Sequence, residues 1–403
     1  MQLTYHYLIL GGGLAGASAI EGIRQNDTTG SIGLLSAEAD FPYHRPPLSK
    51  DLWWGKKTYD QIPVFSESYY RDHLVDLRRN TLVTSIHPEG RYVVDGAGNH
   101  YGYTKLLIAT GSIPNRIKEA GPIAHTFRTA QDYLALARAV VTVEDFLIIG
   151  GGFIGVELAA ALSHAGKKVT LLLQDKGLLS KVLPPDLSDF VTEFYVQKGI
   201  KVIVGDEPAH FEAQGDRVTV TTKQGEQVTT GYVIAGIGVK PERALADSAG
   251  LKAGDGIVVN RFLQTSRPEI YAAGDLALFP CEALGEVIRL EHWDNASAQG
   301  KCAGANMAGG LEPFTYLPYF YSDLFDLGFE AVGKLDGRMR TLAAWETPFR
   351  KGVVAYLENG VVQGILLWNQ GKVLDWARKM VVDKTPLGTV EDLKAMLPVP
   401  AAV

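Results

Sequence analysis

The chain has 403 residues, of which 46% are hydrophobic and 21% charged, and its formal net charge is -6. This length favours two or three domains over a single core, and the acidic balance excludes the broad basic field that nucleic acid binding requires. The two cysteines, Cys281 and Cys302, are too few for a disulfide framework, and no Cys/His cluster has the spacing of a zinc site, so we expect no metal.

The first predicted elements are a strand, Tyr5–Leu10, and a helix, Ala15–Arg24. Between them Gly11, Gly13 and Gly16 spell G-x-G-x-x-G. The first glycine makes a tight turn, the second admits a pyrophosphate and the third lets helix and strand pack closely. The free amides at the start of the helix would then face the phosphates. The preceding residues have no basic segment followed by a long apolar run, so they predict a strand and no signal peptide.

A complete dinucleotide unit also needs an acid at the end of its second strand, about 20 residues further on, to hold the ribose hydroxyls. Glu38 meets this requirement at the end of the segment SIGLLSAE. An exposed surface charge is the alternative interpretation of Glu38 alone. Glu38 therefore indicates a ribose site only in combination with the glycine loop and the strand that precede it.

The same phrase recurs in the middle of the chain. The strand Phe146–Ile149 leads into Gly150, Gly152 and Gly155, and after KKVTLLLQD comes Asp175. The surrounding apolar stretch contains glycines and a glutamate, so we expect a buried strand and helix there and no membrane span. A strand, loop, helix, strand and acid occurring twice favours two dinucleotide sites over coincidence.

Three later segments support this interpretation. Lys105–Ser112 (KLLIATGS) is a buried strand ending in small residues, and the segment GYVIAGIGVKP from Gly231 closes the second unit in a similar way. Ile270–Asp275 (IYAAGD) places an acid where a strand stops. Together these motifs resemble the two-dinucleotide flavoproteins of the glutathione-reductase class. In that class the first unit holds FAD, the second holds NAD(P)H, and the late aspartate binds the ribityl chain.

The segment after the first acid indicates the branch of the class. The disulfide reductases carry a cysteine pair there, whereas this chain reads FPYHRPPLSKDLW. RPPLSK, Arg45 to Lys50, resembles oxygenase-coupled ferredoxin reductases, rubredoxin reductases and apoptosis-inducing-factor-like proteins. The resemblance implies that both residues contact FAD and that Glu157 pairs with the lysine. LEHWDNASAQGKCAGANM resembles their flavin-facing helix, with Trp293 typical of the ferredoxin reductases.

The resemblance implies one set of residues for each cofactor. The expected FAD contacts are Gly11, Gly13, Leu14, Ala15, Gly16, Glu38, Arg45, Lys50, Val83, Ala109, Thr110, Gly111, Arg128, Gly274, Asp275, Glu291, His292 and Trp293. The expected NADH contacts are Gly150, Gly152, Phe153, Ile154, Gly155, Glu157, Asp175, Lys181 and Gly238. The expected catalytic residues are Lys50, Glu157 and Trp293. For Val83 and Arg128, a core valine and a helix-cap arginine remain alternatives.

Other segments favour the apoptosis-inducing-factor branch. DKGLLSKVLPPDLS resembles its dinucleotide-binding segment, and YFYSDLFDLGFEAVG resembles its C-terminal segment, with Tyr321 in place of the usual tryptophan. The long insertion and the basic N-terminus of the animal proteins are missing. The nuclear and cell-death roles of those proteins are therefore not carried over.

The fold class expected is α/β, with two Rossmann-like dinucleotide-binding domains and a small α+β C-terminal domain. We assign 1–112 and 243–310 to FAD binding, 113–242 to NAD(P)H binding, and 311–403 to the C-terminal domain. In that last domain Asn359-Gly360 predicts a type I′ hairpin, and Val373–Val382 has helical periodicity. The aromatic stripe Tyr316, Tyr319, Phe320 and Tyr321 favours core or interface over an electron relay. In the family this domain lies at the dimer contact, which makes a homodimer the candidate assembly.

The expected function is a cytoplasmic flavoprotein oxidoreductase that moves hydride from NADH to FAD and then electrons to a ferredoxin or rubredoxin. Asp175 would bond the ribose 2′-hydroxyl and repel a 2′-phosphate, which favours NADH over NADPH. The nearby Lys176 and Lys181 weaken that preference, and so does Leu173, which stands where the family commonly has its acid. The alternatives are a slow NADH-binding redox sensor that acts through interactions, and an NADH oxidase or quinone reductase.

Overall fold

The computed structural model describes residues 2–398, which group into two compact units. The first unit contains the chain up to Arg45, Tyr59–Ile113 and Lys240–Leu317. The second contains Pro46–Thr58, Pro114–Val239 and the chain from Pro318. The short segment Pro46–Thr58 and the C-terminal strands thus group with the second glycine loop, whereas the three-domain division made from sequence stays a prediction. Each unit is described by itself.

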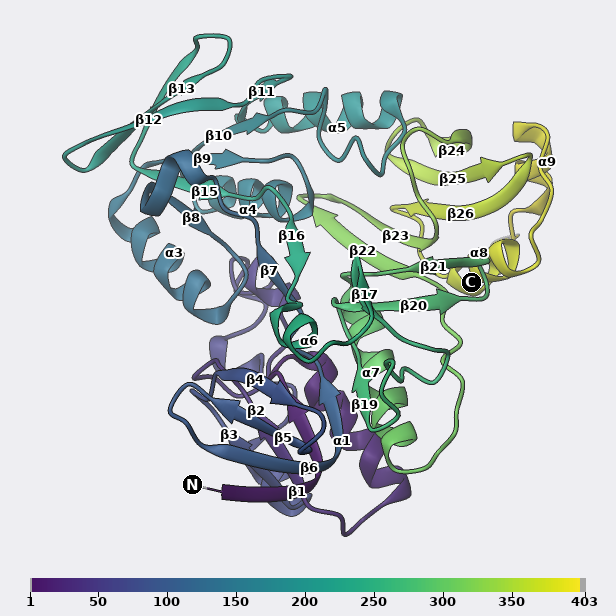
Figure 1. The fold of residues 1–403 in the computed structure, drawn as a ribbon. Coiled ribbons are helices and arrows are strands. Elements are labelled where there is room, and N and C mark those ends of the chain that lie inside the picture. The colour runs from purple at the N-terminus through teal and green to yellow at the C-terminus, as the bar shows by residue number, and fades with distance from the viewer. Residues whose placement is uncertain (1, 399–403) are drawn as a thin grey trace. The chain divides into compact units, whose positions relative to one another are not determined.

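The first unit is built on a seven-stranded sheet of order β3-β2-β1-β6-β5-β4, with β19 also paired to β6 (Figure 1). Its strands are β1 (Gln2–Leu10), β2 (Ile32–Leu35), β3 (Val75–Arg78), β4 (Val83–His87), β5 (Tyr92–Asp95), β6 (His100–Ile108) and β19 (Ile270–Ala272). The long strand β6 pairs antiparallel with β5 through its first residues and parallel with β19 through its last. Strands β1, β2 and β6 are parallel, so their carboxyl ends share one edge of the sheet. The first glycine loop follows β1 at this edge. A four-stranded sheet of β17 (Ala253–Gly254), β18 (Gly256–Val258), β20 (Ala277–Cys281) and β21 (Glu286–Ile288) completes this unit.

Two long helices of the first unit pack against each other through small residues. They are α1 (Leu14–Asn26) and α7 (Trp293–Met307), and the unit also has the short α2 (Glu67–Asp72), η2 (Tyr59–Gln61) and α6 (Ala244–Ser248). A Cβ added to Gly300 would lie 2.2 Å from the carbonyl oxygen of Ala15, and one added to Gly304 would lie 2.1 Å from that of Ala19. Only glycine therefore allows the two helix backbones to approach this closely.

The second unit repeats the parallel design. Its sheet has the order β11-β10-β9-β15-β8, formed by β8 (Ala124–Thr126), β9 (Asp145–Ile149), β10 (Lys168–Leu173), β11 (Lys201–Val204) and β15 (Tyr232–Ala235). A smaller antiparallel sheet is formed by β12 (Pro208–Gln214), β13 (Arg217–Thr222) and β14 (Gln227–Thr230). Its helices are η1 (Pro46–Leu48), η3 (Lys118–Ile123), α3 (Ala130–Thr142), α4 (Phe153–His164) and α5 (Pro185–Gln197). Strands β7 (Ser112–Pro114) and β16 (Val239–Pro241) pair where the chain leaves and re-enters the first unit.

The C-terminal part of the second unit is a five-stranded antiparallel sheet of order β22-β23-β26-β25-β24 (Figure 1). Its elements are β22 (Tyr319–Leu324), β23 (Leu327–Gly333), β24 (Arg340–Thr347), β25 (Lys351–Glu358), β26 (Val361–Trp368), α8 (Leu374–Val382) and α9 (Val390–Met396). Asn359 and Gly360 connect β25 to β26 with φ values of 52° and 78°, and both positive angles suit the predicted type I′ turn. The predicted helix is confirmed as α8.

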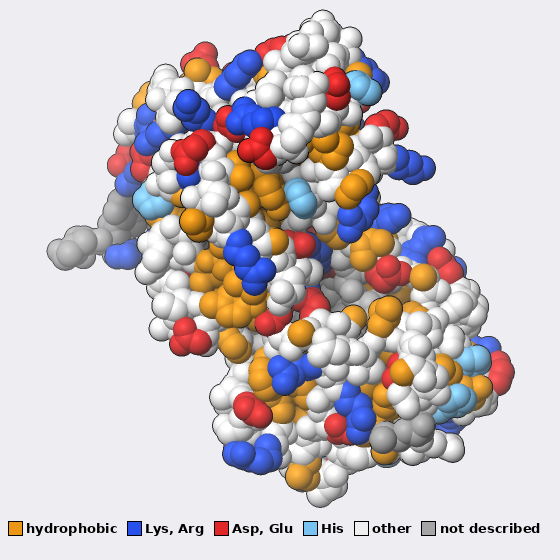
Figure 2. Space-filling model, turned by 90° about the vertical axis from the view of Figure 1, so that its left-hand side faces the viewer, with side chains coloured by type: hydrophobic (Ala, Val, Ile, Leu, Met, Phe, Trp, Pro, Cys, Tyr) orange, Lys and Arg blue, Asp and Glu red, His pale blue; other side chains and the backbone are white. Residues whose placement is uncertain are grey.

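The predicted elements around both glycine loops are confirmed with small shifts of their ends. Strand β1 and helix α1 are longer than predicted, because three further residues of β1 pair with β6. Within residues 2–398 no helix is long and apolar enough to cross a membrane. On the face shown in Figure 2, positive and negative side chains are interspersed among hydrophobic ones.

Candidate functional site

The first glycine loop has the backbone geometry that a bound pyrophosphate needs. Gly11 has a φ of +117°, and a Cβ there would lie 2.2 Å from the carbonyl oxygen of Ala109. Gly16 is equally tight, since its Cβ would lie 2.1 Å from the oxygen of Gly11, whereas a Cβ on Gly13 would meet nothing within 4 Å. Gly13 is the N-cap of α1 and supplies no side-chain cap, and the first turn carries no acid. The amides that begin α1 are thus left to an anionic ligand, in the manner of dinucleotide folds.

Glu38 is held in place before any ligand arrives. Its carboxylate accepts a hydrogen bond of 2.6 Å from the hydroxyl of Tyr43 and one of 2.7 Å from the guanidinium of Arg45. Arg45 also donates to the Tyr43 hydroxyl at 3.1 Å. Two charge-assisted bonds from different directions fix the carboxylate where a ribose would meet it. The predicted contacts Glu38 and Arg45 are therefore brought together by Tyr43, which we had not singled out.

The start of α7 contributes polar groups that have no partner in the protein. Asn295 and Gln299 are fully buried, yet the Oδ1 of Asn295 and the Nε2 of Gln299 make no hydrogen bond among the described residues. Gln299 uses its other amide atom, Oε1, to accept from the backbone of Gly274 at 2.8 Å. Buried amides are nearly always satisfied. The orphaned atoms beside Gly274 and the open loop at α1 therefore fit a bound dinucleotide such as FAD.

His292 and Trp293 stand at the N-terminus of α7, as predicted. Burial lowers the pKa of His292 to about 4, against the opposing charge of Asp275, so the imidazole is neutral near pH 7. Trp293 is 40% exposed and donates from Nε1 to the Nδ1 of His44 at 2.9 Å. Arg289 forms a hydrogen bond in the same region, since its guanidinium donates to the backbone oxygen of Asp275 at 3.0 Å. A helix N-terminus with a neutral imidazole can stabilise negative charge that develops on a ligand.

Two other predicted FAD contacts, Val83 and Arg128, belong to different units. Val83 is buried in the core of the first unit, in agreement with the core alternative. Arg128 belongs to the second unit, where it precedes the capping box of α3. Its backbone amide donates to the side chain of Asp132 at 2.9 Å, which agrees with its helix-cap alternative. Both assignments to the adenine stay predictions.

The second glycine loop reproduces the first almost atom for atom. Gly150 has a φ of +118°, and a Cβ there would lie 2.3 Å from the oxygen of Gly236. The Cβ of a residue at Gly155 would lie 2.0 Å from the oxygen of Gly150, and Gly152 is again open. Gly152 is the N-cap of α4, with no side-chain cap and no acid in the first turn. The amides beginning at Phe153 and Ile154 are thus exposed in the way that suits a second dinucleotide.

The two ribose acids occupy equivalent positions but have different surroundings. Gly11 donates its amide to Leu35, and Gly150 donates its amide to Leu172. Counted from Leu35 and Leu172, Glu38 and Asp175 each stand three residues further on. The side chain of Asp175 is 45% exposed and lies 4.0 Å from Lys181. Among residues 2–398 no hydrogen bond fixes its carboxylate as Tyr43 and Arg45 fix that of Glu38. The surroundings of the second loop are also more apolar than those of the first loop.

Leu173 causes that apolar character. It is 2% exposed, and its Cδ1 would lie 2.6 Å from a Cβ on Gly151. At the corresponding place in the first loop, a Cβ on Gly12 would lie 2.3 Å from the hydroxyl of Ser36. Asp175 is therefore the candidate ribose acid of the second loop, and the buried Leu173 takes no part in polar recognition.

Lys50 and Glu157 form a buried ion pair within the second unit. The ammonium lies 2.8 Å from a carboxylate oxygen, with side-chain exposures of 12% and 5%. Burial opposes the charge on Lys50, yet the adjacent carboxylate more than compensates, so the pKa of Lys50 lies above its ordinary value. The predicted pair is confirmed, and Lys50 is a permanent cation at this place.

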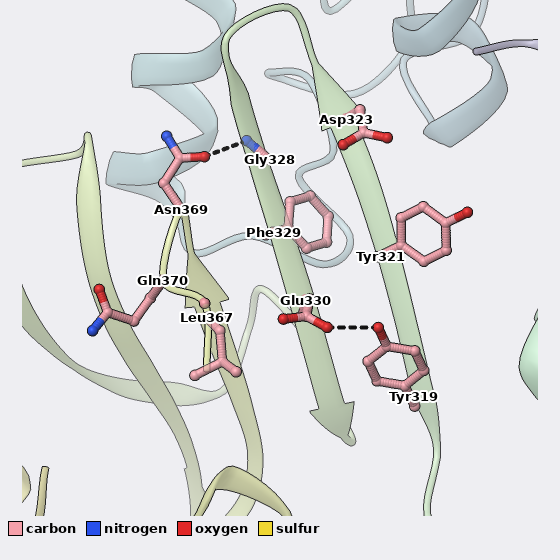
Figure 3. A pocket seen from close by; sticks show the side chains of 10 residues that line it. Tyr319, Tyr321, Asp323, Gly328, Phe329, Glu330, Leu367, Asn369 and Gln370 are labelled. Carbon is pink, nitrogen blue, oxygen red and sulfur yellow. Dashed lines mark hydrogen bonds between the residues drawn. The ribbon is translucent and has the colours of Figure 1, made fainter. Parts of the chain in front are cut away.

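The pair lies beside the C-terminal sheet. The ammonium of Lys50 is 4.8 Å from the centre of the Tyr321 ring, within the range of a cation–π contact. Tyr321 is 38% exposed and, together with Tyr319 and Asp323, lines an open groove of about 420 Å³ (Figure 3). Phe320 instead contacts Phe153 on the other face. Of the two places expected for the aromatic stripe, core or interface, the core is thus excluded for Tyr321, and its place in an interface stays a prediction.

The remaining chemistry of the described residues is sparse. Both cysteines are free, and burial raises the pKa of Cys281 above its ordinary value and that of Cys302 to about 11. Neither is a ready thiolate nucleophile. Among residues 2–398 no group of three or more His, Cys, Asp or Glu side chains could hold a metal ion.

Two loops of this geometry in one chain accord with the sequence of a known family. Residues 5–300 match the family described as pyridine nucleotide-disulphide oxidoreductase. The chain belongs to this family. It is thus an oxidoreductase with the two-dinucleotide-binding fold, in which the predicted α/β class is confirmed.

Individual relatives of this oxidoreductase agree over nearly its whole length. It is 34% identical to the ferredoxin reductase subunit of 5,5'-dehydrodivanillate O-demethylase from Sphingobium, over 94% of this chain and 93% of that protein. It is 33% identical to mitochondrial apoptosis-inducing factor 1 from Dictyostelium discoideum, over 97% of this chain and 80% of that protein. Among solved structures it resembles putidaredoxin reductase in a covalent complex with putidaredoxin, with a TM-score of 0.90, 30% identity and coverage of 95% and 94%.

Several residues of the two sites were not singled out from sequence. Tyr43, Ser49, Gln299 and Ser322 all bond to predicted site residues or to their neighbours. Tyr43 and Ser49 lie inside the quoted segment FPYHRPPLSK, so proximity in sequence was the available signal. Ser322 comes from a distant strand and left no such signal.

Proposed function

We propose that this chain binds FAD in its first unit and NADH in its second, and passes electrons from NADH to a small iron–sulfur protein such as a ferredoxin or rubredoxin. The observation that carries the proposal is the presence of two glycine loops with uncapped helices and equivalent acids, Glu38 and Asp175. The redox chemistry belongs to the flavin when it is bound, because it accepts a two-electron hydride and can return electrons one at a time.

The chain's own residues supply binding and charge. Glu38 is set to hold the adenosine ribose, and Asp275 to hold the ribityl chain near the amides of α7. The N-terminus of α7 at Trp293 is set to stabilise negative charge on a cofactor of the first unit, and the cation of Lys50 supplies positive charge within the second unit. Glu157 orients Lys50. No side chain is required to transfer a proton in this scheme.

The electron acceptor follows from the relatives. Ferredoxin reductases and a rubredoxin reductase are similar to this chain, and one similar solved structure is a reductase in complex with putidaredoxin. Neither cysteine of this chain is a low-pKa thiolate suited to dithiol exchange. Delivery of electrons to an iron–sulfur partner is consistent with both observations. A cytoplasmic location is part of the same proposal, because its two thiols are free.

Steady-state turnover with alternative acceptors tests the function. Purified protein loaded with FAD is mixed with NADH and, in separate assays, with a ferredoxin, a rubredoxin, a quinone and oxygen. The proposal expects the fastest turnover with one of the two iron–sulfur proteins. Slow turnover with every acceptor, together with a long-lived complex after NADH addition, would support the redox-sensor alternative. Faster turnover with quinone or oxygen would support the oxidase or quinone reductase.

A further inference from the structure

The carboxylate of Glu157 is held by two hydroxyl groups in addition to Lys50. Ser49 donates its hydroxyl to Oε2 at 2.6 Å, and Ser322 donates its hydroxyl to Oε1 at 2.8 Å. Lys50 contacts the same Oε1 at 2.8 Å. Each carboxylate oxygen therefore accepts at least one hydrogen bond. An ionised carboxylate has only acceptor atoms, so it can accept all of these bonds at once.

The carboxylate and its donors come from three segments that are far apart in sequence. Ser49 and Lys50 follow the short helix η1, Glu157 lies in α4, and Ser322 lies in β22. All belong to the second unit. The exposed fractions are 3% for Ser49, 4% for Glu157 and 1% for Ser322, so water does not compete for these bonds. Buried hydrogen bonds of this kind are strong and geometrically demanding.

The alternation of β22 explains how Ser322 reaches the carboxylate. Tyr321 and Asp323 point toward the open groove, as Figure 3 shows, and Ser322 between them points to the opposite, buried face. Tyr321 meanwhile offers its ring to the ammonium of Lys50. One strand thus orients both members of the ion pair.

We propose that Ser49 and Ser322 are positioning residues that fix the Glu157 carboxylate and, through it, the direction of the Lys50 ammonium. The inference rests on the proposed function, because it is in that function that a fixed Lys50 cation serves hydride transfer from NADH bound in the same unit. Without the two hydroxyls, the carboxylate would keep Lys50 alone and could rotate. The ammonium would then lose its single orientation, although NADH would still bind through the glycine loop and Asp175.

The test compares Ser49→Ala, Ser322→Ala and the double variant with Thr230→Val. Thr230 is the matched control, because it is a buried hydroxyl residue of the second unit, 2% exposed, and donates its hydroxyl to the backbone oxygen of Asp145 at 2.8 Å. Ser322→Thr keeps the hydroxyl in a strand, where a β-branched side chain is favoured, and serves as the rescue variant. The two single variants decide the question if the double variant does not fold.

Two readouts are required. The first is the rate at which Lys50 is acetylated by acetic anhydride, measured by peptide mass spectrometry at one fixed pH. The second is anaerobic stopped-flow reduction of the bound flavin at several NADH concentrations, which separates NADH affinity from the rate of reduction. We expect the double variant to show faster acetylation and about tenfold slower reduction, because two hydrogen bonds to a charged group are lost, with unchanged NADH affinity. Thr230→Val and Ser322→Thr should resemble the wild-type protein in both readouts.

The outcomes are separable. If the double variant matches Thr230→Val in acetylation and in reduction, the serines are merely structural and the inference is wrong. If NADH fails to reduce the flavin of the wild-type protein, the proposed function is wrong, whereas the acetylation rates still decide whether the serines orient Lys50.

Discussion

The two glycine loops have nearly the same backbone but different degrees of preparation for a ligand. In the first, Glu38 is fixed by Tyr43 and Arg45. In the second, the equivalent Asp175 is half exposed, and Lys181 is the one cation of residues 2–398 that lies within 4.0 Å of its carboxylate. A site whose groups are ordered beforehand loses little entropy on binding. The first loop is therefore suited to a resident cofactor and the second to one that must leave after each turnover.

The helices that follow the two loops differ in the same sense. Helix α1 packs on α7 through Gly300 and Gly304, and its first turn carries no charged pair. Helix α4 carries Glu157 one turn after its loop, where Glu157 forms the buried ion pair with Lys50. The comparison teaches that two loops with the same backbone can be followed by helices of different chemistry through a few side chains.

The largest effect is expected from the first glycine of each loop. Gly11→Ala would place a methyl group 2.2 Å from a carbonyl oxygen, and Gly150→Ala would place one 2.3 Å from a carbonyl oxygen. With the strain of a positive φ added, each should lower the free energy of unfolding by about 3 kcal/mol or more. Thermal unfolding measures this.

The second glycines provide the control for that prediction. Gly13→Ala and Gly152→Ala meet no atom within 4 Å and have ordinary backbone angles, so stability should change little. Gly13→Ala should lose flavin, whereas Gly152→Ala should keep flavin and bind NADH poorly. Loss of flavin from Gly152→Ala would reverse our assignment of the two loops.

A smaller effect is expected from the ion pair that distinguishes the second unit. Lys50→Met and Glu157→Ala each leave a buried charge unpaired and should each cost about 3 kcal/mol in the rate of flavin reduction. The double variant should be less impaired than the sum of the two, because neither buried charge remains. Anaerobic stopped-flow bleaching gives the cycle. Additive losses would show that the two side chains act independently.

The two acids should differ in what they control. Glu38→Ala removes two charge-assisted bonds and the ribose contact, and should weaken FAD binding by about 2 kcal/mol. Asp175→Ala should leave FAD bound, weaken NADH by about 1 kcal/mol and narrow the preference for NADH over NADPH. Flavin absorbance after dialysis and the KM for each nicotinamide cofactor test this pair. A wild-type protein with higher kcat/KM for NADPH would contradict the role of Asp175.

The smallest effect concerns the pH dependence of stability and is expected from His292 of the first unit. Burial holds the pKa of His292 at about 4, below its ordinary value of 6.5. As pH falls through 6.5 the unfolded chain gains a proton that the folded chain refuses, so stability decreases between pH 6.5 and about 4. The loss should be about 1 kcal/mol at pH 6 relative to pH 8. His292→Gln should remove that part of the acid sensitivity in denaturant unfolding, and an unchanged slope would show that other groups cause it.

Much of the fold could be predicted from the sequence because its signals are local. Both glycine loops, the turn at Asn359-Gly360 and the helix that begins at Trp293 depend on residues adjacent in the chain. The pairing of Lys50 with Glu157 was predictable only through family resemblance. Ser322 could not be found, because its contact depends on which face of β22 meets α4, and that is decided by tertiary packing. The same reason applies to the exposure of Tyr321.

The small-residue seam between α1 and α7 has a consequence for how the protein is made. Residues near Gly22 must wait for Gly300 and Gly304, which leave the ribosome after almost 300 further residues have been added. Strand β19, which completes the same sheet, is also synthesised late. The second loop and its parallel sheet are by then already outside the ribosome. The sheet and the helix pair that begin the chain are consequently completed only after the parallel sheet inserted between their parts has been synthesised.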